Sequence, residues 1–211
     1  MAKRSAPEVN AGSMADIAFL LLIFFLVTTT IETDSGLNRK LPPMEENEDD
    51  VIIKEKNIFQ LSVNGKNQLL LKTGGREELV EVKDLRDEAV AFLDNGGGTG
   101  EDACKFCQGQ RNPKSSDNFS KAVISLQNDR STNYDVYIAI QNEIIAAYNT
   151  LRDREFKRAF PTIGMSFVEA NARYKDPRTP SKEKEKLKEK LTEIKLLIPQ
   201  VFSEAEPKKS N

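Results

Sequence analysis

The 211-residue chain contains no histidine, no tryptophan and only two cysteines, and its formal net charge is -2. The absence of histidine excludes Ser–His and Cys–His nucleophilic pairs and histidine-ligated metal sites within one chain. The near-neutral charge provides no polybasic face of the kind that binds nucleic acid. We therefore expect a protein that binds no nucleic acid, holds no cofactor and is not an enzyme, with a thiol redox role of the two cysteines as the alternative.

Long apolar runs are also scarce, since the chain has only one, SMADIAFLLLIFFLVTTTI. Its unbroken apolar core, residues 17–27, reaches about eighteen residues when Met14, Ala15 and the threonines up to Ile31 are added, or about 27 Å of helix, which is just enough to cross a bilayer core. The basic start at Lys3 and Arg4 is also typical of cleaved signal peptides, but no small-x-small cleavage site follows. The run is apolar on every face, which disfavours a core helix of a soluble domain. The sequence therefore predicts one retained transmembrane helix over residues 13–31.

A single acidic residue, Asp16, lies at the start of this run. A carboxylate near hydrocarbon is unfavourable by several kcal/mol, so an ionisable residue inside a membrane segment indicates a functional site. A local role is the alternative, because Ser13 and Asp16 have the S-x-x-D spacing of a capping box and Asp16 faces the positive end of the helix dipole. The two roles do not exclude each other, because a first turn can be buried among partner helices.

Charge around the span predicts its orientation. Lys3 and Arg4 precede it closely, whereas acidic residues follow it, so the positive-inside rule assigns residues 1–12 to a cytoplasmic tail. The rest of the chain then lies outside the cytoplasm. Residues 32–56 contain glycine, a Pro-Pro pair and an acidic stretch, which is a composition typical of a flexible linker.

One part of this extracytoplasmic linker has a pattern of its own. Leu37, Leu41 and Pro42 form an extended segment that ends in Leu-Pro. Segments flanked by proline can pair with the edge of a partner's sheet. We therefore treat these three residues as a candidate partner-binding motif.

The remaining residues, 57–211, predict one α+β domain. NIFQLSV and QLLLK flank Asn64-Gly65, a strong hairpin signal. Apolar residues at helical spacing follow over 82–93, then the strand candidate AVISLQ, then a second helical pattern over 134–151. The order β-β-α-β-α favours a small layer of sheet covered by helices on one face.

The C-terminal third predicts a helical extension over about 152–198. Its apolar stripe is Leu187, Leu191, Ile194 and Ile198, and Pro199 ends the pattern. This helix either packs on its own domain or contacts another subunit. VFSEAEP, which follows, is a candidate for a final short strand.

Cys104 and Cys107 lie in a glycine-rich insertion over about 96–118. A C-x-x-C in an oxidising compartment can be a disulfide, a redox pair or half of a metal site. A closed zinc site would need a second subunit or carboxylates, because the chain offers no further cysteine and no histidine. A disulfide, free thiols and a catalytic redox pair remain open, and the last would make the chain a membrane-anchored periplasmic thiol redox protein.

The membrane-proximal sequence resembles the ExbD/TolR family of ion-driven energy transducers. Glu8, Val9 and Asn10 match the start of the family pattern, Asp16 falls on its proton-carrying aspartate, and Phe25-Leu26-Val27 falls on its Phe-Met-Val. The Leu41-Pro42 pair, and more weakly Asp129 with Tyr134, continue the likeness downstream. Gly12-Ser13 departs from the family's Thr-Pro, so the helix entry differs.

The resemblance implies a function and a set of partners. The chain would be an inner-membrane subunit with a cytoplasmic N-terminus and a periplasmic domain, which couples the proton motive force to TonB-dependent or related transport across the outer membrane. It would act as a homodimer inside a ring of ExbB/TolQ-like multi-span subunits and work on a TonB-like energy transducer. In this interpretation Asp16 takes up a proton from the periplasmic side and releases it to the cytoplasm.

Overall fold

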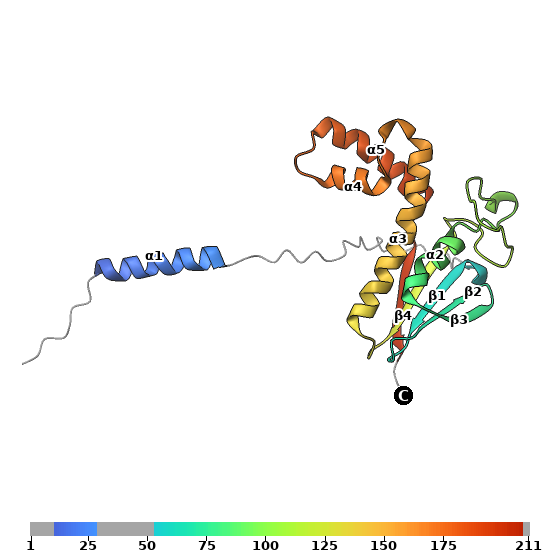
Figure 1. Cartoon of the computed structure of the whole chain (residues 1–211), viewed down its shortest axis with the longest axis horizontal. Coiled ribbons are helices and arrows are strands. Elements are labelled where there is room, and N and C mark those ends of the chain that lie inside the picture. Colours follow the sequence, from blue (N-terminus) through green and yellow to red (C-terminus); the bar gives the residue numbers. More distant parts are fainter. Residues whose placement is uncertain (1–10, 29–52, 209–211) are drawn as a thin grey trace, which may run out of the picture. The chain divides into compact units, whose positions relative to one another are not determined.

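The computed structural model describes residues 11–28 and 53–208, which fall into two compact units, Met1–Asp49 and Asp50–Asn211 (Figure 1). The described residues of the first unit form one helix, α1 (Ala11–Thr28). No helix in the described ranges meets the length and apolarity needed to cross a membrane. Residues 29–31 of the predicted span 13–31 lie outside the described ranges, as do residues 1–10 and the linker residues Leu37, Leu41 and Pro42.

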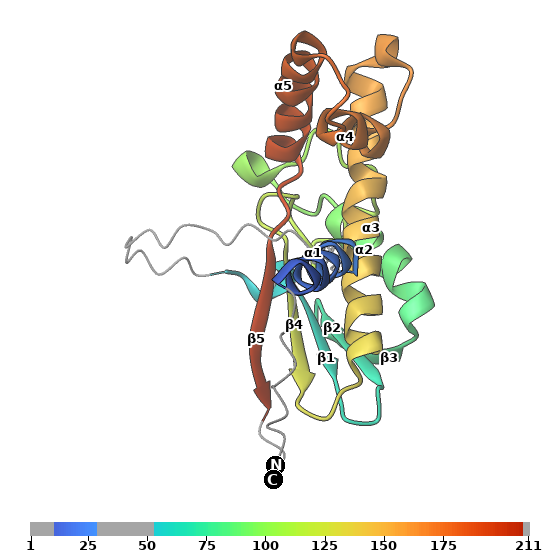
Figure 2. The same ribbon diagram turned by 90° about the vertical axis from the view of Figure 1, so that its left-hand side faces the viewer.

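The second unit contains a five-stranded mixed sheet of order β3-β2-β1-β4-β5 (Figures 1 and 2). The strands are β1 (Ile58–Val63), β2 (Leu69–Thr73), β3 (Arg76–Val80), β4 (Val123–Asp129) and β5 (Phe202–Lys208). β1 pairs antiparallel with β2 and parallel with β4, which makes it the central strand. The predicted α+β class, the hairpin and the strands at β4 and β5 are confirmed. β3 was not predicted, because its sequence REELV is too polar to show the alternation of a half-buried strand.

One face of the sheet carries the main core. Alternate residues of β1, β2 and β4 are buried there, as period-2 packing requires. Two helices, α2 (Leu85–Leu93) and α3 (Tyr134–Ala159), cover this face in both ribbon views. α3 begins at Asn133, whose side chain accepts a hydrogen bond from the amide of Asp135.

A separate helical lobe follows the core. α3 continues past the sheet and packs against α4 (Phe167–Lys175) and α5 (Ser181–Leu197). The apolar residues of this second core are Phe156, Phe167, Ala170, Leu187, Leu191 and Ile194. The residues of the predicted extension therefore form a small core of their own with the end of α3. The described part of this unit also contains short 3-10 turns at Glu55–Asn57, Val82–Asp84, Gly100–Asp102 and Pro161–Ile163.

Polar contacts attach the returning chain to α3. The Arg152 guanidinium donates two hydrogen bonds, of 3.1 and 2.8 Å, to the carbonyl of Ile198 at the end of α5. The Tyr148 hydroxyl donates to the carbonyl of Val201. Farther along β5, the side chains of Tyr137 and Gln141 both donate to Glu204. α3 thus holds the helical lobe and the last strand along one of its faces.

Candidate functional site

Asp16 is the only ionisable residue of α1. It lies in the second turn, because the helix begins at Ala11, and the first turn contains no acidic residue. The backbone amides that lack a partner, and that a capping box satisfies, are those of the first turn. A helix that begins at Ala11 therefore argues against a capping role for Asp16. The side chain of Ser13, the other half of the predicted capping pair, is outside the described part of the structure.

The surroundings of Asp16 on α1 are apolar. Nine large apolar side chains of the helix are 42 to 62 % exposed, and they are Met14, Ile17, Phe19, Leu20, Leu21, Leu22, Ile23, Phe24 and Phe25. Seven of them, residues 19–25, are consecutive, so they point to every side of the helix. A helix that is apolar all round needs an apolar environment on every side. The one group on it that can bind and release a proton is the carboxyl group of Asp16.

A second cluster of functional interest lies where the linker enters the domain. Asp117, whose side chain is 2 % exposed, accepts a hydrogen bond of 3.1 Å from the Asn57 side chain. The backbone amide of Asp117 donates to Asn57 Oδ1 at 2.8 Å. Lys56 Nζ lies 2.5 Å from Asp117 Oδ1, and Lys54 Nζ lies 3.8 Å from Asp117 Oδ2. We call this set of residues, Lys54, Lys56, Asn57 and Asp117, the entry cluster.

The entry cluster keeps a buried carboxylate charged. Burial by itself would raise the pKa of Asp117, but hydrogen bonds from Lys56 and Asn57 outweigh burial and hold the pKa below its usual range. The pKa of the neighbouring Asp102 is lowered as well, because its carboxylate accepts a hydrogen bond from Lys121. Lys54 and Lys56, which belong to the predicted linker 32–56, are thus tied to the insertion by ion pairs.

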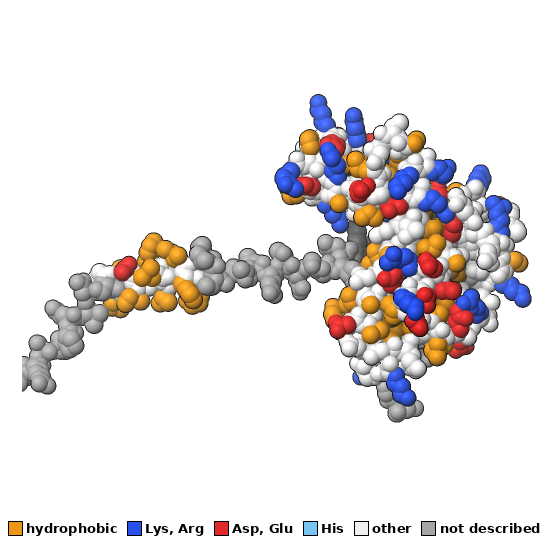
Figure 3. Space-filling view, viewed as in Figure 1, with side chains coloured by type: hydrophobic (Ala, Val, Ile, Leu, Met, Phe, Trp, Pro, Cys, Tyr) orange, Lys and Arg blue, Asp and Glu red, His pale blue; other side chains and the backbone are white. Residues whose placement is uncertain are grey.

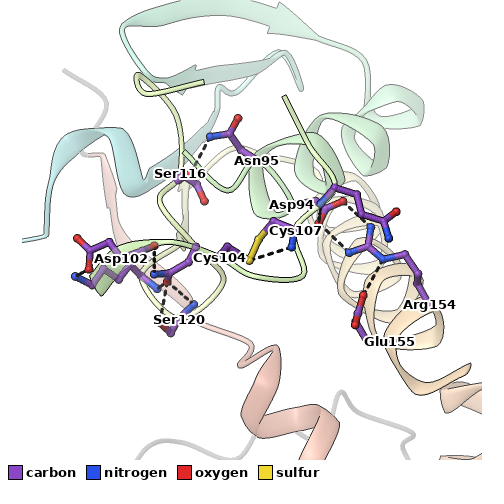
Figure 4. Close-up of a disulfide and its surroundings, with 12 residues drawn as sticks. Asp94, Asn95, Asp102, Cys104, Cys107, Ser116, Ser120, Arg154 and Glu155 are labelled. Carbon is purple, nitrogen blue, oxygen red and sulfur yellow. Dashed lines mark hydrogen bonds and ion pairs between the residues drawn. A yellow bond between two sulfur atoms is a disulfide. The ribbon is translucent and has the colours of Figure 1, made fainter. Parts of the chain in front are cut away.

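The insertion itself is a folded loop held by side chains of the α2 end. Asn95 Nδ2 donates to the carbonyls of Asn112 and Ser116, at 2.9 and 2.8 Å, and Asn95 Oδ1 accepts from the Asn112 amide. The backbone of Gly97 lies so close to Asn112 that only glycine fits there, because a Cβ at position 97 would lie 2.2 Å from the Asn112 carbonyl oxygen. Asp94 extends the network with a bidentate pair to Arg154 of α3, at 2.6 and 2.8 Å (Figure 4).

Cys104 and Cys107 form a disulfide within the insertion (Figure 4). Cys107 is only 5 % exposed and packs in the main core, and its backbone amide donates to Cys104 Sγ. Among the described residues, no group of three or more candidate ligands could hold a metal ion. A buried sulfur of this kind resembles a structural disulfide more than a redox pair, which needs an accessible thiolate.

The sequence predicts a functional role for Asp16 and singles out the two cysteines, but it gives no sign of the entry cluster or of Asp94. Their partners lie 60 residues away in the chain, from Asn57 to Asp117 and from Asp94 to Arg154. Polar residues beside a glycine-rich stretch are usually solvated, so no periodic signal marks them. Only the close spacing of Asp94-Asn95 after a helical pattern could have suggested a capping or clamping role.

Comparison with known proteins adds one finding. The sequence pattern of the family described as biopolymer transport protein ExbD/TolR matches residues 2–150. No curated protein matches the chain. The matched range includes α1, the insertion and the first part of α3, whereas α4, α5 and β5 follow it.

Proposed function

The chain belongs to the ExbD/TolR family of biopolymer transport proteins, and we propose that it is the proton-coupled subunit of an ExbB/ExbD/TonB-type motor. Members of this family are inner-membrane anchored, non-enzymatic transport components. The observation that carries the proposal is the single carboxylate of Asp16 on a helix whose apolar side chains are exposed all round.

The proposed site works through the difference between a charged and a neutral carboxyl group. Charged Asp16 is unfavourable next to hydrocarbon or apolar helices, whereas protonated Asp16 is tolerated there. A proton that enters from the periplasmic side neutralises the group, and its release to the cytoplasm restores the charge. Each cycle changes which surroundings α1 prefers, so proton flow drives a rotation or shift of the helix.

The energy of one step is sufficient to bias such a movement. One elementary charge that moves through about 100 mV of membrane potential releases about 2.3 kcal/mol. Repeated loading and unloading of Asp16 therefore supports directed work. The ring that surrounds α1 in this proposal is an ExbB/TolQ-like multi-span subunit, and two copies of the chain lie inside it as a homodimer.

The domain receives the movement through the linker. Residues 32–52 connect α1 with the entry cluster, and the next residues form β1, the central strand of the sheet. Because β1 is bonded to β2 on one side and β4 on the other, a pull on its N-terminal end is shared by both neighbours. The proposed output is work on a TonB-like transducer in the periplasm.

The decisive experiment uses Asp16→Asn in the full-length chain. The variant should still insert into the inner membrane and copurify with a multi-span ring subunit, because asparagine keeps the size and polarity of the side chain. It should not restore the transport defect of a deletion strain, since it cannot carry a proton. Asp34→Asn, which removes a carboxylate just after the run, is the matched control and should restore transport in full.

Two results would contradict the proposal. One is normal transport by the Asp16→Asn variant. The other is purification of the wild-type chain from its native membrane without any multi-span partner. Loss of insertion in the variant would point to a structural role for Asp16 instead.

A further inference from the structure

β3 forms one edge of the sheet, and its outer side pairs with no other described strand (Figures 1 and 2). Such an edge presents backbone N–H and C=O groups that can accept another strand. Native edges are usually protected by proline, lysine or a bulge. β5, the opposite edge, contains Pro207 and Lys208 and has an irregular register, whereas β3 has no proline, no lysine and an unbroken register.

The turn before β3 determines which backbone groups point outward. Gly74 and Gly75 both have positive φ, of 55° and 81°, and they join Thr73 to its partner Arg76 in a two-residue hairpin. In such a hairpin the two residues that flank the turn, here Thr73 and Arg76, are hydrogen-bonded to each other. Along β3, every second residue from Arg76 onward is then bonded to β2 in the same way. The backbone groups of Arg76, Glu78 and Val80 therefore face β2. Those of Glu77 and Leu79 face outward.

The side chains beside these outward groups combine an apolar spot with negative charge. Leu79 is 64 % exposed and, with Leu70, lines a hollow of about 230 Å³ on the open face of the sheet. Glu77, on the same face, is exposed and forms no ion pair with a described residue. An added strand would thus place one side chain against Leu79 and another beside Glu77.

Negative charge predominates over the whole region around β3. Residues 76–88 contain six acidic and three basic residues. The basic ones are already paired, Arg76 with Glu78 and Glu88, Lys83 with Glu81, and Arg86 with Glu143. Figure 3 shows acidic side chains gathered over the part of the domain that holds α2 and β3, with a few basic ones among them. This negative charge repels a second copy of β3, which is acidic as well, and attracts a basic strand.

We propose that the outer edge of β3 is a docking site for an extended, basic segment of a partner protein, which adds to the sheet as a sixth strand. The backbone of Glu77 and Leu79 provides the hydrogen bonds. Side chains two positions apart on the added strand lie on the same face of the sheet, so one of them is apolar, against Leu79, and the next on that face is lysine or arginine, beside Glu77 and its acidic neighbours. This inference goes beyond the proposed function, because it involves neither Asp16 nor proton flow.

A capped peptide of six to eight residues, in which valine and lysine take turns at every second position and threonine fills the positions between them, is the probe for this site. Titrated into the full-length chain in detergent micelles, it should shift the backbone amide resonances of Glu77 and Leu79 in a saturable way. The same peptide with glutamate in place of lysine should bind at least about tenfold more weakly. Raising the salt concentration should weaken the binding of the basic peptide, because exposed charges are screened.

Leu79→Pro tests the hydrogen bond directly. Its amide points away from β2, so proline removes an outward donor and no bond of the sheet. We expect binding about tenfold weaker or more, the size of one lost hydrogen bond. Leu79→Ala keeps the amide and should weaken binding less than the proline variant does. Glu77→Lys should also reduce the affinity for the basic peptide.

An N-methylated peptide gives the same test without changing the protein. Methylation of alternate peptide nitrogens blocks one edge of the added strand, so one of the two methylation patterns should abolish binding while the other preserves it. The inference is overturned by equal binding of both patterns, by shifts that map to β5, or by absence of binding at millimolar peptide. In the last case the acidic residues of β3 serve only to keep the edge unpaired. None of these results bears on Asp16→Asn, so the two proposals fail independently.

Discussion

Asn57 and Asp117 are bonded to each other in both directions across 60 residues of sequence. The Asn57 side chain donates to the Asp117 carboxylate at 3.1 Å, and the Asp117 amide donates to the Asn57 side chain at 2.8 Å. This pair joins the start of β1 to the end of the Gly/Cys insertion. Under the proposed function it is also the first fixed point that a pull through the linker meets in the domain.

Asp117→Asn should therefore weaken the domain. The substitution removes the charge that Lys56 and the Asn57 side chain bind, and it leaves buried donors without their full acceptor. We expect the free energy of unfolding to fall by about 1–3 kcal/mol, measured by denaturant unfolding of the full-length chain. Lys54→Ala is the control, because Lys54 is 59 % exposed and its ion pairs should contribute less than about 1 kcal/mol. Equal losses in both variants would contradict the importance of the buried carboxylate.

The same carboxylate predicts how stability changes in acid. The pKa of Asp117 is lower in the folded domain than in the unfolded chain, where it is about 3.9. The stabilising contribution is therefore present above the unfolded pKa and is lost as the pH falls through the folded pKa. The difference in unfolding free energy between wild type and Asp117→Asn should be constant from about pH 5 to pH 7 and shrink below about pH 4. A difference that grows in acid would refute this assignment.

The disulfide should contribute to stability and not to transport. Cys104 and Cys107 are three residues apart, so the bond closes a very short loop. The chain-entropy estimate for such a loop is about 2 kcal/mol. The double variant Cys104→Ser, Cys107→Ser should lose no more than that, because Asn95 and Asp117 also hold the insertion. Transport should stay at the wild-type level in a deletion strain, whereas a thiol redox function would be abolished.

Arg152 should control how firmly the helical lobe is attached. Arg152→Met keeps the aliphatic volume but removes both hydrogen bonds to the buried carbonyl of Ile198. We expect a loss of about 1–3 kcal/mol, concentrated in the lobe. Hydrogen exchange should accelerate in α4 and α5 and stay slow in β1. Lys188→Met, on the exposed side of α5, should leave the exchange of both regions unchanged.

Much of the domain was predictable from local patterns. The Asn64-Gly65 turn and its flanking apolar residues indicate the β1–β2 hairpin, and AVISLQ indicates β4. The apolar spacing of residues 134–151 indicates α3, and Pro199 correctly ends α5 before the strand that becomes β5. These elements are visible because each is half-buried, and burial of one face leaves a regular apolar period in the sequence.

β3 shows where such reasoning stops. Its five residues are charged or exposed at most positions, since this edge strand buries little on either face. The strand exists because the Gly74-Gly75 turn returns the chain to β2, which supplies the hydrogen-bond ladder. No periodic signal accompanies a strand that is held by its neighbour's backbone.

By itself the sequence determined the α+β class, the position of Asp16 in the one long apolar run and the C-x-x-C of the insertion, because each of these depends on neighbouring residues. Only the tertiary structure decided that Asn57 meets Asp117, that Asp94 meets Arg154, and that the C-terminal extension forms its own core at the end of α3. Those contacts join residues far apart in the chain. Their stability comes from burying charges beside suitable donors, and burial arises only when the whole domain has folded.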